Sequence, residues 1–144
     1  MNKLLLTTLL AALAHPALAR DDQHMYPIKD ALEAPEAQSK LDKNIKLFFG
    51  NQPYPKSAKA LGEWKTNKKT NAFNKSDKQA CEWAFLSAVL ELQERAQKEG
   101  GNAVVGIKSN YKSIERSSED EYMCGAGALM AGVALKGTVV KLSK

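Results

Sequence analysis

Side chains suited to redox, metal or acyl-transfer chemistry are scarce in this sequence. Its 144 residues include two cysteines and two histidines. One histidine, His15, lies in a segment that we expect to be removed, which leaves only His24 in a polar N-terminal stretch. We therefore expect neither an imidazole-based triad nor a site of several histidine ligands, and no cofactor and no metal.

The two cysteines, Cys81 and Cys124, are separated by 42 intervening residues and do not form a C-x-x-C motif. In an oxidising compartment an isolated pair of this kind indicates one disulfide. The alternative is two separate buried thiols. A disulfide offers no ligand to a metal, so the first interpretation also argues against a thiolate metal site.

Acidic side chains cluster in a polar segment near the C-terminus: Glu115, Glu119, Asp120 and Glu121. They could hold a hard cation weakly, but a solvated acidic loop is the favoured interpretation. Elsewhere Glu63, Glu82 and Glu91 show no spacing that suggests a paired acid and base. We therefore predict that the protein is not an enzyme.

Basic residues are concentrated between positions 56 and 78 and are interleaved with Tyr54, Trp64 and Phe73. One interpretation is a site for an anionic polymer or a lipid headgroup, and the favoured one is a solvated rim around a loop. The candidate anion-binding residues are Lys56, Lys59, Lys65, Lys68, Lys69 and Lys75, with Lys78 close by.

The stretch CGAGALMAGVALKG at residues 124–137 is unusually rich in glycine and alanine. No glycine in it is followed by Lys and then Ser or Thr, which excludes a P-loop, and a lone G-x-G is a weak nucleotide signal. Its uncharged run, residues 123–135, is shorter than the roughly 20 residues that cross a bilayer. We expect a strand over residues 122–131 with the helix directly on it, a bend near Gly132, and a final strand over residues 134–142.

Residues 77–99 form the clearest helical pattern. Ser76 with Gln79 three residues later predicts a capping box, and Gly100 with Gly101 predicts the C-terminal end. One apolar stripe (Cys81, Phe85, Ala88, Leu92 and Ala96) predicts the core face. A second stripe on nearly the opposite side, of Trp83, Leu86 and Leu90, predicts an interface. Its expected cover is the N-terminal segment, through Tyr26, Ile28 and Leu32, and the alternative is a second copy of the chain.

The remaining pattern predicts strands over residues 45–52, 58–66 and 103–111, with polar loops at 67–75 and 112–121. Residues 20–44 are polar and interrupted by Pro27 and Pro35, so we expect an extension with short helical turns at 28–32 and 36–41. The fold class predicted is α+β, with an antiparallel or mixed sheet of about four strands on one long helix. Residues 45–144 would form its single domain.

The N-terminus has the pattern of a secretory signal peptide. Lys3 is followed by an apolar run over residues 4–14 and by an A-x-A site at residues 17–19, which predicts cleavage after Ala19. An amphipathic or buried N-terminal helix is the alternative. We expect a periplasmic protein, with no transmembrane segment in the mature chain. Its positive charge, formally +5 for the whole chain, suits lipid phosphates or cell-wall polymer better than nucleic acid.

The order of a helix, the segment GGNAVV at residues 100–105, a polar loop and a Gly/Ala-rich terminal strand resembles the YbjQ-like proteins, small domains often labelled heavy-metal-binding. Residues 78–142 also resemble the C-terminal domain of the stress-sensing outer-membrane lipoprotein of the Rcs phosphorelay. In that domain a cysteine before the helix is bonded to one in the last strand, which corresponds to Cys81 and Cys124. The chain lacks the lipidation cysteine, the second cysteine pair and the proline-rich tether of that sensor.

The whole predicted mature chain is similar to small secreted proteobacterial proteins labelled "excinuclease ATPase", after the ATPase component of the ABC excinuclease. We interpret that label as an error, because the chain has no P-loop and no zinc cysteines and begins with a predicted signal peptide. The function predicted is that of a secreted, non-catalytic envelope protein that binds a partner, an envelope protein for example, or monitors the envelope. The alternative is a module that binds anionic lipid or polymer through residues 56–78, and a hydrolytic enzyme is the third hypothesis.

Overall fold

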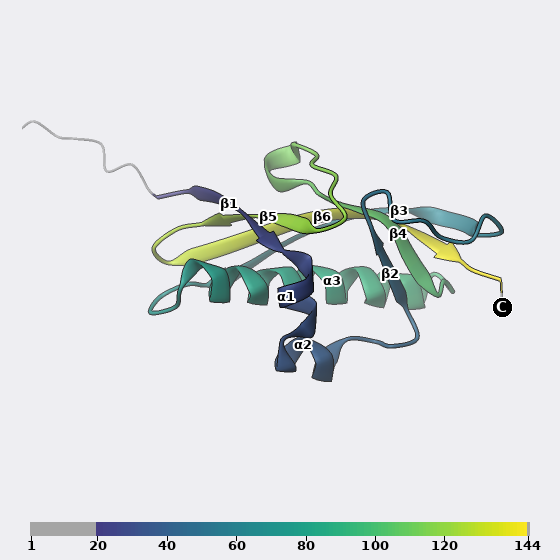
Figure 1. The fold of residues 1–144 in the computed structure, drawn as a ribbon, viewed down its shortest axis with the longest axis horizontal. Coiled ribbons are helices and arrows are strands. Elements are labelled where there is room, and N and C mark those ends of the chain that lie inside the picture. Colours follow the sequence, from purple (N-terminus) through teal and green to yellow (C-terminus); the bar gives the residue numbers. More distant parts are fainter. Residues whose placement is uncertain (1–19, 144) are drawn as a thin grey trace, which may run out of the picture.

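The computed structural model describes residues 20–143 as one mixed sheet with a long helix across one face (Figure 1). The predicted signal peptide, residues 1–19, lies outside the described residues. The strands are β1 (Asp22–Pro27), β2 (Lys46–Phe49), β3 (Lys59–Asn71), β4 (Ala103–Ser109), β5 (Glu121–Ala126) and β6 (Met130–Lys141). The helices are α1 (Ile28–Glu33), α2 (Pro35–Lys40) and α3 (Asp77–Lys98), with a short 3₁₀ turn, η1 (Tyr111–Ser113).

Helix α3 confirms the helix predicted over residues 77–99. Ser76 is its N-cap, and its Oγ accepts a hydrogen bond from the backbone N–H of Gln79 at 3.1 Å. Beyond the C-terminal end, Gly100 has a φ of +77°, the left-handed conformation that glycine adopts most easily. The predicted core stripe is fully buried from Cys81 to Ala96.

The sheet has six strands, two more than predicted, and its strand order is β1-β5-β6-β4-β2. Strand β3 pairs along the other side of β6 over its whole length. The β2–β4 pair is parallel, and all other pairs are antiparallel. Because β6 is long, one of its sides can hold β5 near its start and β4 near its end, which gives the sheet its curled outline.

The N-terminal segment is part of the sheet. Its predicted helical turns are present as α1 and α2, but residues 22–27 form β1, which pairs with β5 so that His24 lies opposite Cys124 and Tyr26 opposite Tyr122. No local pattern indicated this strand, because an edge strand with one face in water needs few apolar residues. Residues 20–44 are therefore not a separate extension lying on a finished domain.

Two loop predictions were wrong. Strand β3 runs to Asn71, through most of the stretch NKKTNAFNK that was predicted to be a loop. The break in the glycine-rich segment comes at residues 127–129, where Gly127 N–H donates to Met130 O at 2.8 Å, and not at Gly132, which lies inside β6. Both errors have one cause: backbone pairing with β6 and β5 outweighs weak local preference.

The core lies between α3 and the inner face of the sheet, which is the face toward that helix. Phe85 stacks on Tyr122 of β5 with ring centroids 4.1 Å apart, and Val133 and Leu135 of β6 are buried beneath the helix. The η1 loop covers part of the opposite, outer face (Figure 1). The two faces therefore have separate roles: the inner face makes the core, and the outer face stays accessible beside η1.

Candidate functional site

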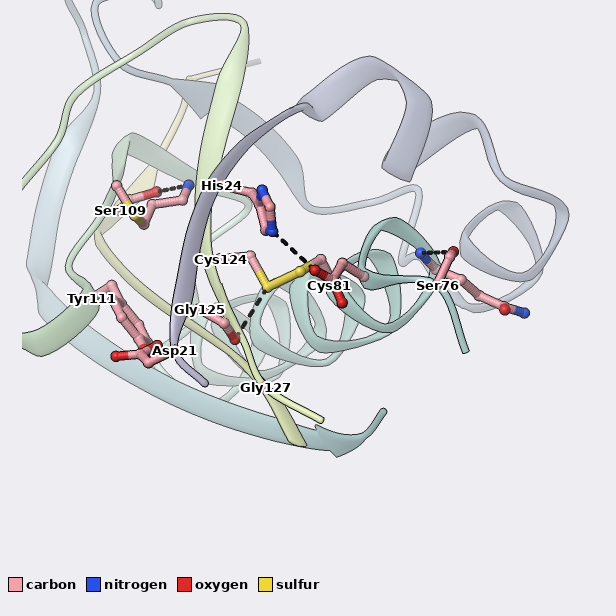
Figure 2. Close-up of a disulfide and its surroundings, with 12 residues drawn as sticks. Asp21, His24, Ser76, Cys81, Ser109, Tyr111, Cys124, Gly125 and Gly127 are labelled. Atoms are coloured by element: carbon pink, nitrogen blue, oxygen red, sulfur yellow. Dashed lines mark hydrogen bonds and ion pairs between the residues drawn. A yellow bond between two sulfur atoms is a disulfide. The ribbon is translucent and has the colours of Figure 1, made fainter. Parts of the chain in front are cut away.

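The two cysteines join the helix to the sheet. The structure bonds Cys81 of α3 to Cys124 of β5, with Cα atoms 5.8 Å apart and both side chains fully buried, in agreement with the predicted disulfide (Figure 2). This bridge is internal and holds α3 against β5. It leaves no free thiol among residues 20–143.

The single histidine of the described chain belongs to an ion-pair cluster at the start of α3. His24 Nε2 lies 3.0 Å from Asp77 Oδ2, and Arg20 donates two hydrogen bonds to the Asp77 carboxylate, each 2.9 Å long. Arg20 also donates to Asp22 at 2.8 Å. The bonds from Arg20, with a smaller contribution from His24, hold the pKa of Asp77 below its ordinary value. The cluster ties the beginning of β1 to the first residue of α3.

Asp22, His24 and Asp77 have the donor types of a metal site, and one ligand atom of each lies within 4.8 Å of the others. The guanidinium of Arg20 already bridges the two carboxylates, so a fixed cation balances their charge. Within residues 20–143 no hydroxyl or thiol hydrogen-bonds to the imidazole, whose partner is Asp77, and Ser76 Oγ accepts from Gln79 N–H at the helix cap (Figure 2). The arrangement is suited to fastening the N-terminal strand, and we assign it no metal.

Within residues 20–143 the four acidic residues of the loop are not gathered into a group of potential metal ligands. Glu115 lies 2.6 Å from Lys136 and 3.3 Å from Lys108, and these two partners lower its pKa. Lys136 also reaches Glu63 at 3.2 Å. The charge of Glu115 is thus neutralised by two lysines of the outer face, Lys136 and Lys108.

The glycines of the Gly/Ala-rich stretch make room for a tyrosine on the outer face. A Cβ atom at Gly125 would lie 2.0 Å from the hydroxyl oxygen of Tyr111, and one at Gly132 would lie 3.8 Å from its ring. Tyr111 and Cys81 are on opposite sides of β5 (Figure 2), so the helix does not lie on these two glycines, contrary to our expectation. The stretch is β-structure, as predicted, although its break lies at residues 127–129, and Gly125 and Gly132 allow the close approach of Tyr111.

Tyr111 fastens η1 to the N-terminal segment. Its hydroxyl donates to Asp21 Oδ1 at 2.8 Å, and Lys112 forms an ion pair with the same carboxylate. Partial burial, followed by the Asp21 contact, raises the pKa of Tyr111 to about 12, so the phenol keeps its proton at neutral pH. Beside the ring is a hollow of about 370 Å³, lined mostly by apolar surface of Leu129, Met130 and the glycines, with Lys69 at its rim.

The six candidate anion-binding lysines do not form one patch. Lys56 lies just before β3 and Lys59 begins it, whereas Lys69 lies ten residues beyond Lys59, roughly 33 Å away. Lys65 and Lys69 share the outer face, whereas Lys68 faces α3 and pairs with Glu91 at 3.1 Å. Lys75 is in the β3–α3 loop and donates to Asn71 O at 2.9 Å. Only Lys69 and Lys75 lie at the end of the molecule that carries exposed apolar side chains, which are described below.

The position of β3 explains much of the lysine content. The strand pairs with β6 on one side only and is therefore a long sheet edge of 13 residues. Lysines on an edge strand hinder pairing with a second chain. For Lys59 and Lys65 this structural role is sufficient.

The residues of the second helix stripe, Trp83, Leu86 and Leu90, contact two different parts of the chain. Leu86 is buried, and with Trp83 it lines a hollow against Ala34 and Ala37, while Lys40 Nζ lies 5.0 Å from the Trp83 ring centroid. Leu90 is half-buried beside Lys68 and Lys69. The N-terminal segment thus covers part of the stripe, but through residues 31–40 of α1 and α2 and not through Tyr26, Ile28 and Leu32, as predicted. A homodimer through Trp83 and Leu90 stays a prediction.

A group of exposed apolar residues was missed by the sequence reasoning. Phe73, Leu129 and Met130 are 60%, 64% and 48% exposed. Phe73 is in the β3–α3 loop, Leu129 is in the β5–β6 turn and Met130 begins β6, and a hydrogen bond from Ala72 N–H to Leu129 O, 2.8 Å long, joins the two segments. We call Phe73, Leu129 and Met130, with Lys69 and Lys75, the tip surface. The β5–β6 turn and the β3–α3 loop meet at one end of the molecule (Figure 1). The only sign of this surface in the sequence was an aromatic residue, Phe73, within a polar stretch.

Comparison of the chain with protein-family models, with curated proteins and with solved structures gives no match. The function is therefore inferred from the structure of this chain itself. Within residues 20–143 no helix combines the length and the apolar composition needed to cross a membrane.

Proposed function

We propose that this chain is a secreted, non-catalytic protein of the cell envelope that acts by binding a partner through the tip surface. The observation that carries the proposal is the exposure of Phe73, Leu129 and Met130 on adjoining segments. A contiguous exposed apolar group on a folded chain marks an interaction site, whereas single exposed apolar residues do not. The buried disulfide supports an oxidising compartment.

The segments that carry these residues are held in place, which is what a binding surface requires. Asn71 Oδ1 accepts from Phe73 N–H at 2.8 Å, and Lys75 N–H donates to Ala72 O at 3.1 Å. Ala72 is buried between them. Phe73 is therefore exposed by a fixed turn and not by a loose end, and little conformational entropy is lost when a partner binds.

Sedimentation with the isolated envelope fraction tests the proposal. Protein recovered after export should sediment with the envelope, and the double variant Phe73→Ser/Leu129→Ser should remain in the supernatant. Tyr54→Ser is the matched control, because Tyr54 is also exposed but lies before β3, at the opposite end of that strand. Equal recovery of all three proteins in the pellet would contradict the proposal.

The compartment is tested separately by intact mass. Export with cleavage after Ala19 gives a chain that begins at Arg20, the residue that clamps Asp77. A chain retained with residues 1–19 attached in the cytoplasm would contradict the secreted location.

The second candidate function is a module for anionic lipid or polymer. One observation favours it: Lys65 and Lys69 share the outer face and form no ion pair with a carboxylate of residues 20–143. The segment 56–78 as a whole cannot act as one site, since its lysines are spread along and across β3. Any anion site must be restricted to the lysines near one end of that strand.

A further inference from the structure

The tip surface has the shape of a projection. Leu129 is at the apex of the short turn that links β5 to β6, and Phe73 is in the neighbouring β3–α3 loop. Met130 lies opposite Asn71 in the β3–β6 register and so continues the apolar group onto the outer face. Apolar side chains that project from loop ends can enter the interface of a bilayer, where no complementary concave partner is needed.

The lysines at this end are not neutralised by the protein. Lys69 lies beside Gly132 and lines the same hollow as Leu129 and Met130, and Lys75 is anchored on Asn71 O at 2.9 Å. Neither forms an ion pair with a carboxylate in the described part of the chain. Two positive charges thus flank the apolar residues and remain available to an outside anion.

The acidic residues near this end have partners other than Lys69 and Lys75. Glu91 and Glu94, which line a hollow with Lys69, pair with Lys68 and Lys98. Asp22 and Asp77 bind Arg20, and Asp21 binds Lys112 and Tyr111. These three carboxylates share two cations, Arg20 and Lys112, so one negative charge is left in the cluster, against the two positive charges of Lys69 and Lys75. The formal charge of these groups together is +1, and the two lysines without a carboxylate partner lie on the side of the apolar residues, where they can meet an anionic surface.

The N-terminal end of the described chain is at the same place. Arg20 donates to Gly127 O at 2.8 Å, next to the turn that carries Leu129. The apolar run over residues 4–14 ends six residues before Arg20. With cleavage after Ala19, the predicted mature chain therefore begins beside the tip surface.

We propose that the tip surface docks on a bilayer that contains anionic phospholipid. Phe73, Leu129 and Met130 enter the headgroup region, and Lys69 and Lys75 bind lipid phosphates. The proposal rests on the function proposed above, because it names the partner of the same surface. A soluble anionic polymer would use the lysines but would leave the apolar residues exposed, so the bilayer accounts for both sets.

Vesicle sedimentation tests the proposal with defined lipids. Exported protein should bind vesicles of phosphatidylethanolamine with phosphatidylglycerol and should bind pure phosphatidylcholine at least tenfold more weakly. Binding should fall steeply when salt is raised to about 1 M, where the Debye length is about 3 Å. Inorganic phosphate at moderate concentration should compete poorly, since it supplies the charge but not the apolar interface.

Neighbouring lysines on one strand supply a matched pair of variants. Lys69→Gln should weaken binding to the anionic vesicles about fivefold, the loss expected for one lysine near such a surface. Lys68→Gln should leave binding unchanged, because Lys68 faces α3 and pairs with Glu91. Phe73→Ser/Leu129→Ser should weaken binding more than tenfold, while Tyr54→Ser should have no effect. Lys69, Phe73, Leu129 and Tyr54 are exposed and Lys68 is half-buried, so none of these changes opens the core, and a circular dichroism spectrum checks folding.

Three results would overturn the proposal: no binding to anionic vesicles at low salt, equal binding to phosphatidylcholine, or equal loss for Lys68→Gln and Lys69→Gln. If the protein still sediments with native envelope through Phe73 and Leu129 in that case, the function proposed above stands and its partner is a protein or a polymer. If envelope binding is also independent of the tip, both proposals fail.

Discussion

The phenol of Tyr111 lies so close above Gly125 that a Cβ atom at the glycine would be 2.0 Å from the phenolic oxygen. The contact is on the outer face of β5, and the same hydroxyl donates to Asp21 at 2.8 Å. One glycine thus allows η1 to fasten the start of the N-terminal segment. This relationship, and not contact with the helix, accounts for glycine at position 125.

Gly125→Ala should lower the free energy of unfolding by about 2 to 3 kcal/mol, because the methyl group displaces the Tyr111 ring and breaks its hydrogen bond. Urea unfolding measures the loss. In a Tyr111→Ala background the same change should cost much less, since the clash is gone. An equal cost in both backgrounds would show that Gly125 serves some other purpose.

Tyr122→Phe should raise the free energy of unfolding by about 1 kcal/mol. The Tyr122 hydroxyl is buried and has no hydrogen-bond partner among the described residues, so its removal relieves an unsatisfied group while the ring stays on Phe85. Tyr111→Phe is the control, and it should lower stability because that hydroxyl is bonded to Asp21. Urea unfolding compares the two, and destabilisation by Tyr122→Phe would contradict the prediction.

Loss of the disulfide should cost about 4 kcal/mol, the loop-entropy value for two cysteines 43 positions apart. The double variant Cys81→Ala/Cys124→Ala should show this loss in urea unfolding without reductant. A reducing agent should bring the wild type to a similar midpoint and leave the variant unchanged. A wild type that is insensitive to reductant under conditions that break the bond would contradict the prediction.

Stability should fall as the pH drops below about 4, in part through Asp77. Its folded pKa is lowered by Arg20, so the unfolded chain takes up the proton first. The contribution is therefore present above the ordinary aspartate pKa, and it is lost as the pH falls through the lowered folded value. Asp77→Asn should flatten this part of the profile of unfolding midpoint against pH. A profile with the same slope in both proteins would assign the acid loss to other carboxyls.

Leu86→Glu should lower the free energy of unfolding by about 3 kcal/mol, because it places a charge at a buried position against α2. Leu90→Glu should cost less than about 1 kcal/mol, since Leu90 is half-buried beside Lys68 and Lys69. Size-exclusion chromatography of the same variants tests the homodimer. A folded monomeric Leu86→Glu protein from a dimeric wild type would favour the dimer over the intrachain cover.

The sequence by itself determined the features that depend on neighbours along the chain or on simple chemistry. Helix α3 could be predicted because its cap, its apolar stripe and its terminal glycines are all local signals. The cysteine pair could be predicted because two thiols in an oxidising compartment have few alternatives. The α+β class followed from one long helix and several short strand patterns.

Tertiary structure alone decided the features that depend on pairing between distant segments. Residues 22–27 and the second half of β3 become strands because β5 and β6 present unpaired backbone groups to them. The same pairing places Lys68 and Lys69 on opposite faces and spreads the predicted lysine site along a sheet edge. It also joins Ala72, next to Phe73, to Leu129, which is 57 residues further along the chain. No local pattern encodes these contacts, because the free energy of a strand pair resides in both partners and neither sequence segment shows it alone.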